Sequence, residues 1–112
     1  MKDESVYLRH ILDAIKKIQS YTSGGAKEFF QNTLVQDAVI RNLEIIGEAV
    51  KNLSIEFRHR HPEVPWRSIT ALRNVLIHEY FGVEIEIVWR VVQRRLPSLK
   101  RYVEMLLAKR KR

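Results

Sequence analysis

The stretch ALRNVLIHEYFG, at residues 71–82, places four polar side chains in an otherwise apolar run. They are Arg73, Asn74, His78 and Tyr80. Burying such groups without partners costs several kcal/mol, so each needs a hydrogen bond, an ion pair or a ligand. Histidine exchanges protons near neutral pH, and arginine binds anionic oxygens. This stretch is therefore the first candidate for chemistry in the chain.

The spacing of these residues separates them into different lines on a helix. Asn74 and His78 are four apart and share one side, so the amide could fix the imidazole tautomer and leave the other nitrogen available. Arg73 and His78 are five apart and point about 140° away from each other. A joint site then needs the reach of the arginine, a distorted helix end or a second chain. The structural alternative is a satisfied Asn74–His78 pair and an ion pair from Arg73 to Glu48 or Glu44.

The composition indicates one globular domain. The chain has 112 residues, of which 46% are hydrophobic and 29% are charged, so residues 1–112 are expected to form a single domain. The absence of cysteine excludes disulfides and thiolate metal sites and fits a reducing compartment. The first residues contain no apolar signal segment, and there is no apolar run of about eighteen residues that could span a membrane. We therefore expect a cytoplasmic protein without a membrane partner.

The positive charge is concentrated near the C-terminal end of the sequence. The net charge is +7, yet residues 1–89 carry eleven basic and twelve acidic side chains. Residues 90–112 carry nine basic side chains against one acidic, and they include a basic tail at about residues 101–112. Such a segment favours a polyanionic partner such as RNA. A solubilising tail is an equally good interpretation of the charge alone.

Apolar residues recur at helical spacing in four long segments. AKEFF, at residues 26–30, is expected to add a short helical turn. Pro97 lies inside the last segment, where proline removes a backbone hydrogen bond, so we expect a kink or break there. The sequence has no strand-like alternation and therefore predicts an all-α bundle of four main helices plus this short turn. The four segments lie at about residues 3–22, 32–60, 65–82 and 84–106.

RNVLIHEY resembles the signature of HEPN domains of the HepT-like family: an arginine, a polar residue, three more residues, a histidine, one residue and a tyrosine. The stretches IRNLEIIGEAVKNLS, PEVPWRSITALRN and VWRVVQRRLPSL are similar to that family in the same order. The resemblance runs from about Leu8 to Leu99 and implies a HEPN-type bundle.

The resemblance implies a function. Proteins of this family are ribonuclease toxins of type VII toxin–antitoxin pairs and cleave RNA without a metal, so neither a metal nor another cofactor is expected. They form homodimers in which the motifs of two chains meet in one cleft. Their partner is a minimal nucleotidyltransferase antitoxin that transfers AMP to the motif tyrosine, which corresponds here to Tyr80.

The resemblance also assigns roles to the motif. His78 would act as base or acid on the RNA, and Arg73 would hold phosphate oxygens and stabilise the added negative charge. Asn74 would orient the reacting groups or bind the phosphate. Glu48 is a candidate partner that positions Arg73, although an Arg41–Glu44 pair on a solvated face explains that region equally well. Three further basic residues on the fourth segment are candidates for guiding RNA: Arg90, Arg94 and Arg101.

Other conspicuous residues have mainly structural interpretations. Gly47 would allow two helices to approach closely, and Asn42 would make a buried hydrogen bond or an interface contact. Trp66 and Trp89 are expected in the core. The RHRH stretch at residues 58–61 has alternate histidines without supporting carboxylates or cysteines, which is not typical of a metal site.

Two other functions use the same residues. In the first, the chain is a non-catalytic adaptor subunit of the nucleotidyltransferase, and the motif binds a nucleotide or RNA. In the second, the chain is a basic dimer that binds nucleic acid without cutting it. The pairing of Arg73 with a titrating histidine favours the enzyme, because nucleotide binding alone does not require His78.

Overall fold

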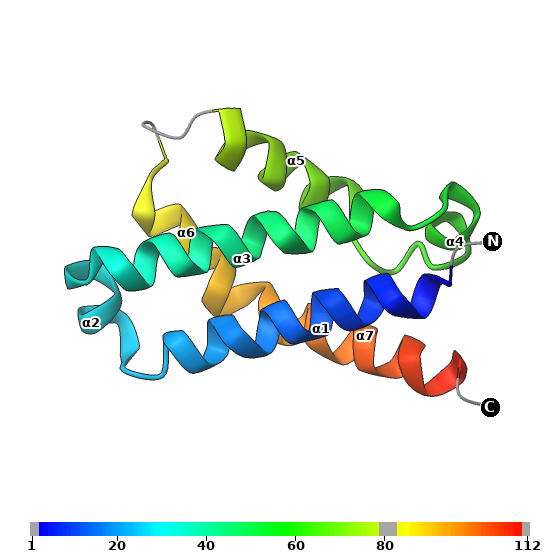
Figure 1. Ribbon diagram of the computed structural model, residues 1–112, viewed down its shortest axis with the longest axis horizontal. Helices are drawn as coiled ribbons and strands as arrows, with labels where there is room; N and C mark the ends of the chain where they lie inside the picture. Colours follow the sequence, from blue (N-terminus) through cyan, green and yellow to red (C-terminus); the bar gives the residue numbers. More distant parts are fainter. Residues whose placement is uncertain (1–2, 79–82, 111–112) are drawn as a thin grey trace.

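The computed structural model describes residues 3–78 and 83–110, and this part of the chain is all-α (Figure 1). The prediction of an all-α bundle with one additional short helical segment is confirmed. No described residue forms a strand. The helices are α1 (Glu4–Tyr21), α2 (Gly25–Gln31), α3 (Thr33–Asn52), α4 (Ile55–Arg60), α5 (Trp66–His78), α6 (Ile85–Arg94) and α7 (Leu96–Arg110).

The two longest helices form the centre of the bundle. α1 and α3 run antiparallel and pack along their length, while α7 packs on α1 and α5 packs on α3 (Figure 1). Each helix buries one apolar stripe, because residues three or four apart share a face. The stripe of α1 consists of Leu8, Ile11, Ala14, Ile15 and Ile18, and that of α3 is centred on Val39, Leu43, Ile46 and Val50.

Local capping by side chains fixes the starts of α1 and α3. The Asp3 carboxylate accepts a hydrogen bond from the Ser5 N–H at 2.9 Å, and the Asn32 amide oxygen accepts one from the Val35 N–H at 3.2 Å. These bonds satisfy backbone donors that a helix start leaves unpaired. Gly25 joins α1 to α2 with a φ of +89°, a conformation that glycine adopts without the penalty of a side chain. The short helix α2 is the predicted turn at residues 26–30, extended by a residue at each end.

The prediction of one continuous helix at residues 32–60 is wrong in one respect, because this segment is divided into α3 and α4. Leu53 is extended, with φ −66° and ψ 143°, and buries its side chain in the core. The Ser54 hydroxyl then caps α4 by accepting a hydrogen bond from the Phe57 N–H at 3.0 Å. The Ser54 N–H donates in turn to the Glu4 carboxylate of α1 at 3.2 Å. A serine that caps a new helix competes with continuation of the old one, and the contact from α1 favours the break.

The break expected near Pro97 is confirmed. α6 ends at Arg94 and α7 begins at Leu96, so Pro97 lies in the first turn of the new helix. A proline is tolerated there because the first backbone N–H groups of a helix have no partner within it. α5 begins at Trp66, directly after Pro65, as predicted, but residues 79–82 of the predicted third helix lie outside the described part of the chain.

Both tryptophans pack in or against the core, as predicted. Trp66 is buried and donates its indole N–H to the His61 carbonyl at 2.9 Å. Trp89 is partly buried, and its ring centroid lies 5.0 Å from that of Phe29. None of the described helices is both long enough and apolar enough to cross a membrane.

Candidate active site

The candidate site is built where α5 packs on α3. Gly47 of α3 is buried directly against Arg73 of α5, and a Cβ atom at position 47 would collide with the Arg73 Cβ and lie 2.7 Å from its Cγ. The missing side chain therefore lets the helix carrying the motif come close to α3, as the sequence suggested. This approach brings the Arg73 side chain alongside the polar face of α3.

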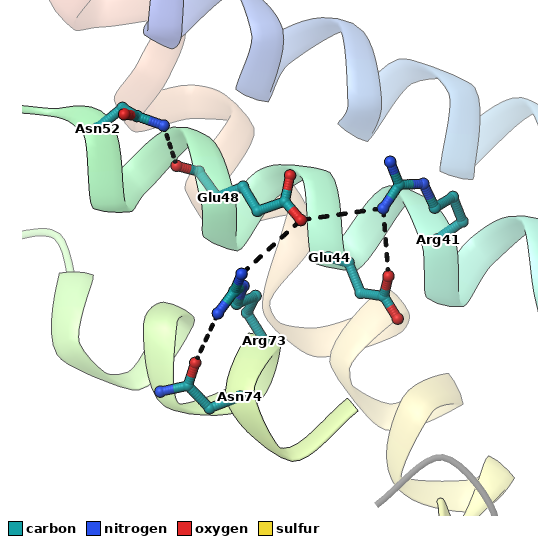
Figure 2. A network of polar contacts seen from close by, with 6 residues as sticks. All are labelled: Arg41, Glu44, Glu48, Asn52, Arg73 and Asn74. Atoms are coloured by element: carbon teal, nitrogen blue, oxygen red, sulfur yellow. Dashed lines mark hydrogen bonds and ion pairs between the residues drawn. The ribbon is translucent and has the colours of Figure 1, made fainter. Parts of the chain in front are cut away.

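Arg73 belongs to a polar network that joins the two helices (Figure 2). Its Nη1 atom donates a hydrogen bond to the Asn74 Oδ1 at 3.0 Å, and its Nη2 atom lies 3.9 Å from the Glu48 Oε1. The same Glu48 oxygen lies 3.9 Å from the Arg41 Nη1, and Arg41 pairs with Glu44 at 3.3 Å. Glu48 therefore contacts Arg73 while the Arg41–Glu44 pair also forms, and a functional role for Glu48 stays a prediction.

The network positions Arg73 but leaves some N–H donors of the Arg73 guanidinium without a partner in the described part of the chain. The side chain is 21% exposed, and its Nε atom is buried without a hydrogen-bond partner among the described residues. The contact with Glu48 is long for a charge-assisted hydrogen bond, which prefers about 2.7–2.9 Å. A guanidinium carries several N–H donors in a planar fork. The remaining N–H donors on Nη1 and Nη2, rather than the buried Nε, thus retain the capacity to bind an anionic oxygen such as a phosphate oxygen.

The predicted hydrogen bond between Asn74 and His78 does not form within the described residues. The Asn74 amide oxygen instead accepts from Arg73. The charged donor is the stronger partner for that oxygen, which explains why the amide turns towards the guanidinium. His78 is the last residue of α5, and its side chain is exposed.

One chain does not bring the whole motif to one face. Arg73 lies against α3, whereas His78 is exposed at the end of α5, in keeping with their angular separation on the helix. Tyr80 falls outside the described residues. A site that includes both Arg73 and His78 therefore requires groups or movements beyond this single helix surface.

An apolar groove adjoins α5, and helical periodicity alone does not predict it. Ile69 and Leu72 share a side of the helix with Leu76, but only Leu76 is fully buried. Ile69 and Leu72 instead help to line a cavity of about 550 Å³. The groove depends on how the helices pack, because helical periodicity identifies an apolar side of a helix without showing which neighbouring helix covers it. The groove is completed by Leu43, Ile46, Pro65, Ser68, Val91, Arg94, Arg95, Leu96, Ser98, Leu99 and Tyr102.

The three candidate RNA-guiding arginines are all exposed, but they do not form one cluster with Arg73. Arg90 lies on α6, and Arg94 at the end of that helix lines the groove. Arg101 lies on α7 and donates to the Ser98 hydroxyl at 3.3 Å. Their part in binding RNA stays a prediction.

The histidines of the RHRH stretch have separate surroundings. His59 is exposed, whereas His61 is half-buried with its Nδ1 atom 3.6 Å from the Glu63 carboxylate. Within residues 3–78 and 83–110 there is no group of three or more side chains that could hold a metal ion. Asn42 makes the predicted buried hydrogen bond, from its amide nitrogen to the Ala38 carbonyl at 2.9 Å.

Comparisons with known proteins agree with the sequence pattern. The family described as "Ribonuclease HepT-like" matches residues 11–106. A "Probable ribonuclease HepT" from Thermococcus cleftensis is 45% identical over 101 residues, covering 89% of this chain and 92% of that protein. A "Putative RNase TTE0752" from Caldanaerobacter subterraneus subsp. tengcongensis is 42% identical over 112 residues, covering 99% of this chain and 100% of its own length.

A longer relative matches over part of its length. It is the "Gamma-glutamylcyclotransferase and putative RNase MJ0434" of Methanocaldococcus jannaschii, which is 46% identical over 100 residues. The match covers 88% of this chain but only 45% of the relative. No solved structure gives a significant match.

Proposed function

This chain belongs to the HepT-like ribonuclease family, and from that premise we propose that it is a metal-independent endoribonuclease, the toxin of a toxin–antitoxin pair. The observation that carries the proposal is the way in which the Arg73 guanidinium is held. Its guanidinium is held by Glu48 and Asn74 at the α3–α5 contact, yet it keeps donors for an anion. His78, which can exchange protons, is exposed at the end of the same helix.

The proposed reaction uses the nucleophile that RNA already contains. His78 accepts the proton of a ribose 2′-hydroxyl, and the 2′ oxygen forms a bond to the adjacent phosphorus. The bond from phosphorus to the 5′ oxygen breaks, and that oxygen takes up a proton from the solvent. The products are a 2′,3′-cyclic phosphate and a free 5′-hydroxyl. Arg73 stabilises the extra negative charge on the phosphorane, and Asn74 holds the Arg73 fork in place.

We further propose that the complete site lies between two chains. Arg73 and His78 diverge on one helix, so two copies of α5 facing each other could bring one motif residue from each chain to a shared phosphate. The apolar groove beside α5 and the partly exposed Val75 and Ile77 on the same helix support this arrangement. A homodimer is therefore part of the proposal.

The proposed regulation acts on Tyr80. A nucleotidyltransferase antitoxin would attach AMP to its hydroxyl, two positions after His78 in the sequence. The added phosphate would bring negative charge and bulk to the place where an RNA phosphate has to bind, and so it would block cleavage by repulsion. The support for this step is the family resemblance of RNVLIHEY.

The proposal is tested by cleavage of bulk cellular RNA in excess EDTA. We expect wild type to cut and His78→Ala and Arg73→Ala not to cut, while His59→Ala, which removes another exposed histidine, cuts like wild type. Circular dichroism and size-exclusion chromatography check that all variants have the same fold and oligomeric state. Mass spectrometry of Tyr80 first confirms that wild type carries no AMP.

Absence of cutting by unmodified wild type would contradict the proposal and favour the non-catalytic adaptor. Cutting that depends on an added divalent cation would contradict the metal-independent mechanism. If the His78→Ala variant cut RNA at the wild-type rate, His78 would not be the proton acceptor of the reaction.

A further inference from the structure

A second basic site lies at the end of the bundle where α4 meets the last turns of α7. A cavity of about 420 Å³ opens there, lined by Phe57, Arg60, His61, Leu106 and Lys109. In Figure 1 α4 and the C-terminal end of α7 lie at the same end of the molecule, and α5 runs away from that end towards His78. The cavity is therefore separate from the Arg73 network.

The lining of this cavity suits an anion. Phe57 and Leu106 are buried and provide an apolar floor, while Arg60 and Lys109 are exposed at the rim. Among the lining residues that the structure describes there is no aspartate or glutamate. Among the described residues neither Arg60 nor Lys109 makes an ion pair, so both charges are available to a ligand.

Tertiary packing brings these two charges together, since Arg60 and Lys109 are far apart in the sequence. A planar guanidinium and a compact ammonium on two sides of one hollow can contact different oxygens of a phosphate diester. The Phe57 ring packs on His61, with ring centroids 4.6 Å apart, and is buried. The cavity therefore offers charge to a backbone phosphate rather than a free ring to a stacked base.

We propose that the α4–α7 cavity is a phosphate-binding exosite that holds the RNA backbone away from the cleavage site. This inference rests on the proposed function, which supplies RNA as the polyanion. α5 has thirteen residues and spans about 20 Å, so a strand that touches both the cavity and the end of α5 must contain several nucleotides. The exosite would then strengthen binding of long RNA without taking part in the reaction.

Binding is measured with a long 2′-O-methyl RNA, which lacks the free 2′-hydroxyl and cannot be cut. Fluorescence anisotropy in EDTA gives the Kd of wild type, of the Arg60→Gln/Lys109→Gln double variant and of a matched Lys16→Gln/Lys17→Gln variant. Lys16 and Lys17 are exposed on the C-terminal half of α1, and their replacement removes the same charge. All replaced side chains are exposed, so the fold should be retained, and circular dichroism checks it.

The salt dependence provides the sharpest readout. Each phosphate contact on a single strand contributes about −0.7 to the slope of log K against log salt, so loss of two contacts should make the slope shallower by about 1.4. We expect this change and a severalfold higher Kd for the Arg60/Lys109 variant, with the Lys16/Lys17 variant close to wild type. Equal changes in both double variants, or a wild-type slope in the Arg60/Lys109 variant, would overturn the exosite.

This experiment separates failure of the exosite from failure of the proposed ribonuclease, because it requires no cleavage. If the Arg60/Lys109 variant shows the shallower salt slope while wild type never cuts RNA, the exosite stands and the proposed reaction fails. If wild type cuts RNA and the Arg60/Lys109 variant binds as tightly as wild type, the exosite fails and the reaction stands. The exosite would also be overturned if the Arg60/Lys109 variant bound an acidic partner protein more weakly than wild type does but bound RNA with unchanged affinity.

Discussion

The chemistry of this site depends on how a single arginine is held. Arg73 contacts Asn74 and Glu48 but keeps donors for a phosphate. Replacement by lysine keeps the charge and loses the planar fork. We expect Arg73→Lys to lower the rate of the cleavage step by about 10²-fold, the magnitude seen when one stabilising donor is lost. Single-turnover cleavage in EDTA measures this rate.

Arg41 supplies the matched control at the residue scale. It lies at the same 3.9 Å from Glu48 as Arg73, but it is on α3 and 61% exposed. Arg41→Lys should therefore cut RNA at nearly the wild-type rate. An equal loss in both variants would show that the network around Glu48 matters and that the Arg73 fork does not.

At the scale of elements, the contact between α3 and α5 depends on Gly47. Alanine is the better helix former by about 1 kcal/mol, but its Cβ would meet the Cβ of Arg73, which no rotamer change can move away. We expect strain to exceed that gain and Gly47→Ala to destabilise the fold by about 1–2 kcal/mol net. Urea unfolding at a fixed protein concentration measures the change, and the displaced Arg73 should also slow cleavage.

Gly24 offers the control for this prediction. A Cβ at Gly24 would meet only the carboxylate end of the Glu28 side chain, which is flexible and can turn away. Gly24→Ala should therefore unfold close to wild type. If Gly47→Ala were as stable as Gly24→Ala, the close approach of α5 to α3 would not be required for the fold.

At the scale of the whole molecule, α5 leaves apolar surface uncovered. Val75 is 46% exposed, and it shares its helix with the groove residues Ile69 and Leu72. If a second copy covers this face, a charge there must be desolvated without a partner. We expect Val75→Lys to convert dimers to monomers in light scattering and to abolish cleavage, although Arg73 and His78 are both retained.

Met105 on α7 is 48% exposed and serves as the control. Met105→Lys adds the same charge at a similarly exposed apolar position, and it should leave both the dimer and cleavage intact. A dimer that persists in Val75→Lys, with full activity, would place the interface on another face of the bundle.

The sequence by itself determined the helical class and most of the boundaries, because these depend on local chemistry. Apolar spacing and Pro97 act over a few residues. The helical class and the break near Pro97 are confirmed, whereas the single helix expected at residues 32–60 is divided into α3 and α4. The family could also be identified from short stretches in a fixed order. The roles of Arg73, Asn74, His78 and Tyr80 stay predictions.

Tertiary structure alone decided the features that join distant parts of the chain. The break before α4 involves Glu4 of α1, which lies fifty residues from Ser54. The Asn74 amide turned to Arg73 because packing on α3 left the guanidinium close by, and local spacing had favoured His78 instead. The α4–α7 cavity likewise depends on packing. Local preferences act within a few residues, whereas these contacts exist only after the helices have packed against one another.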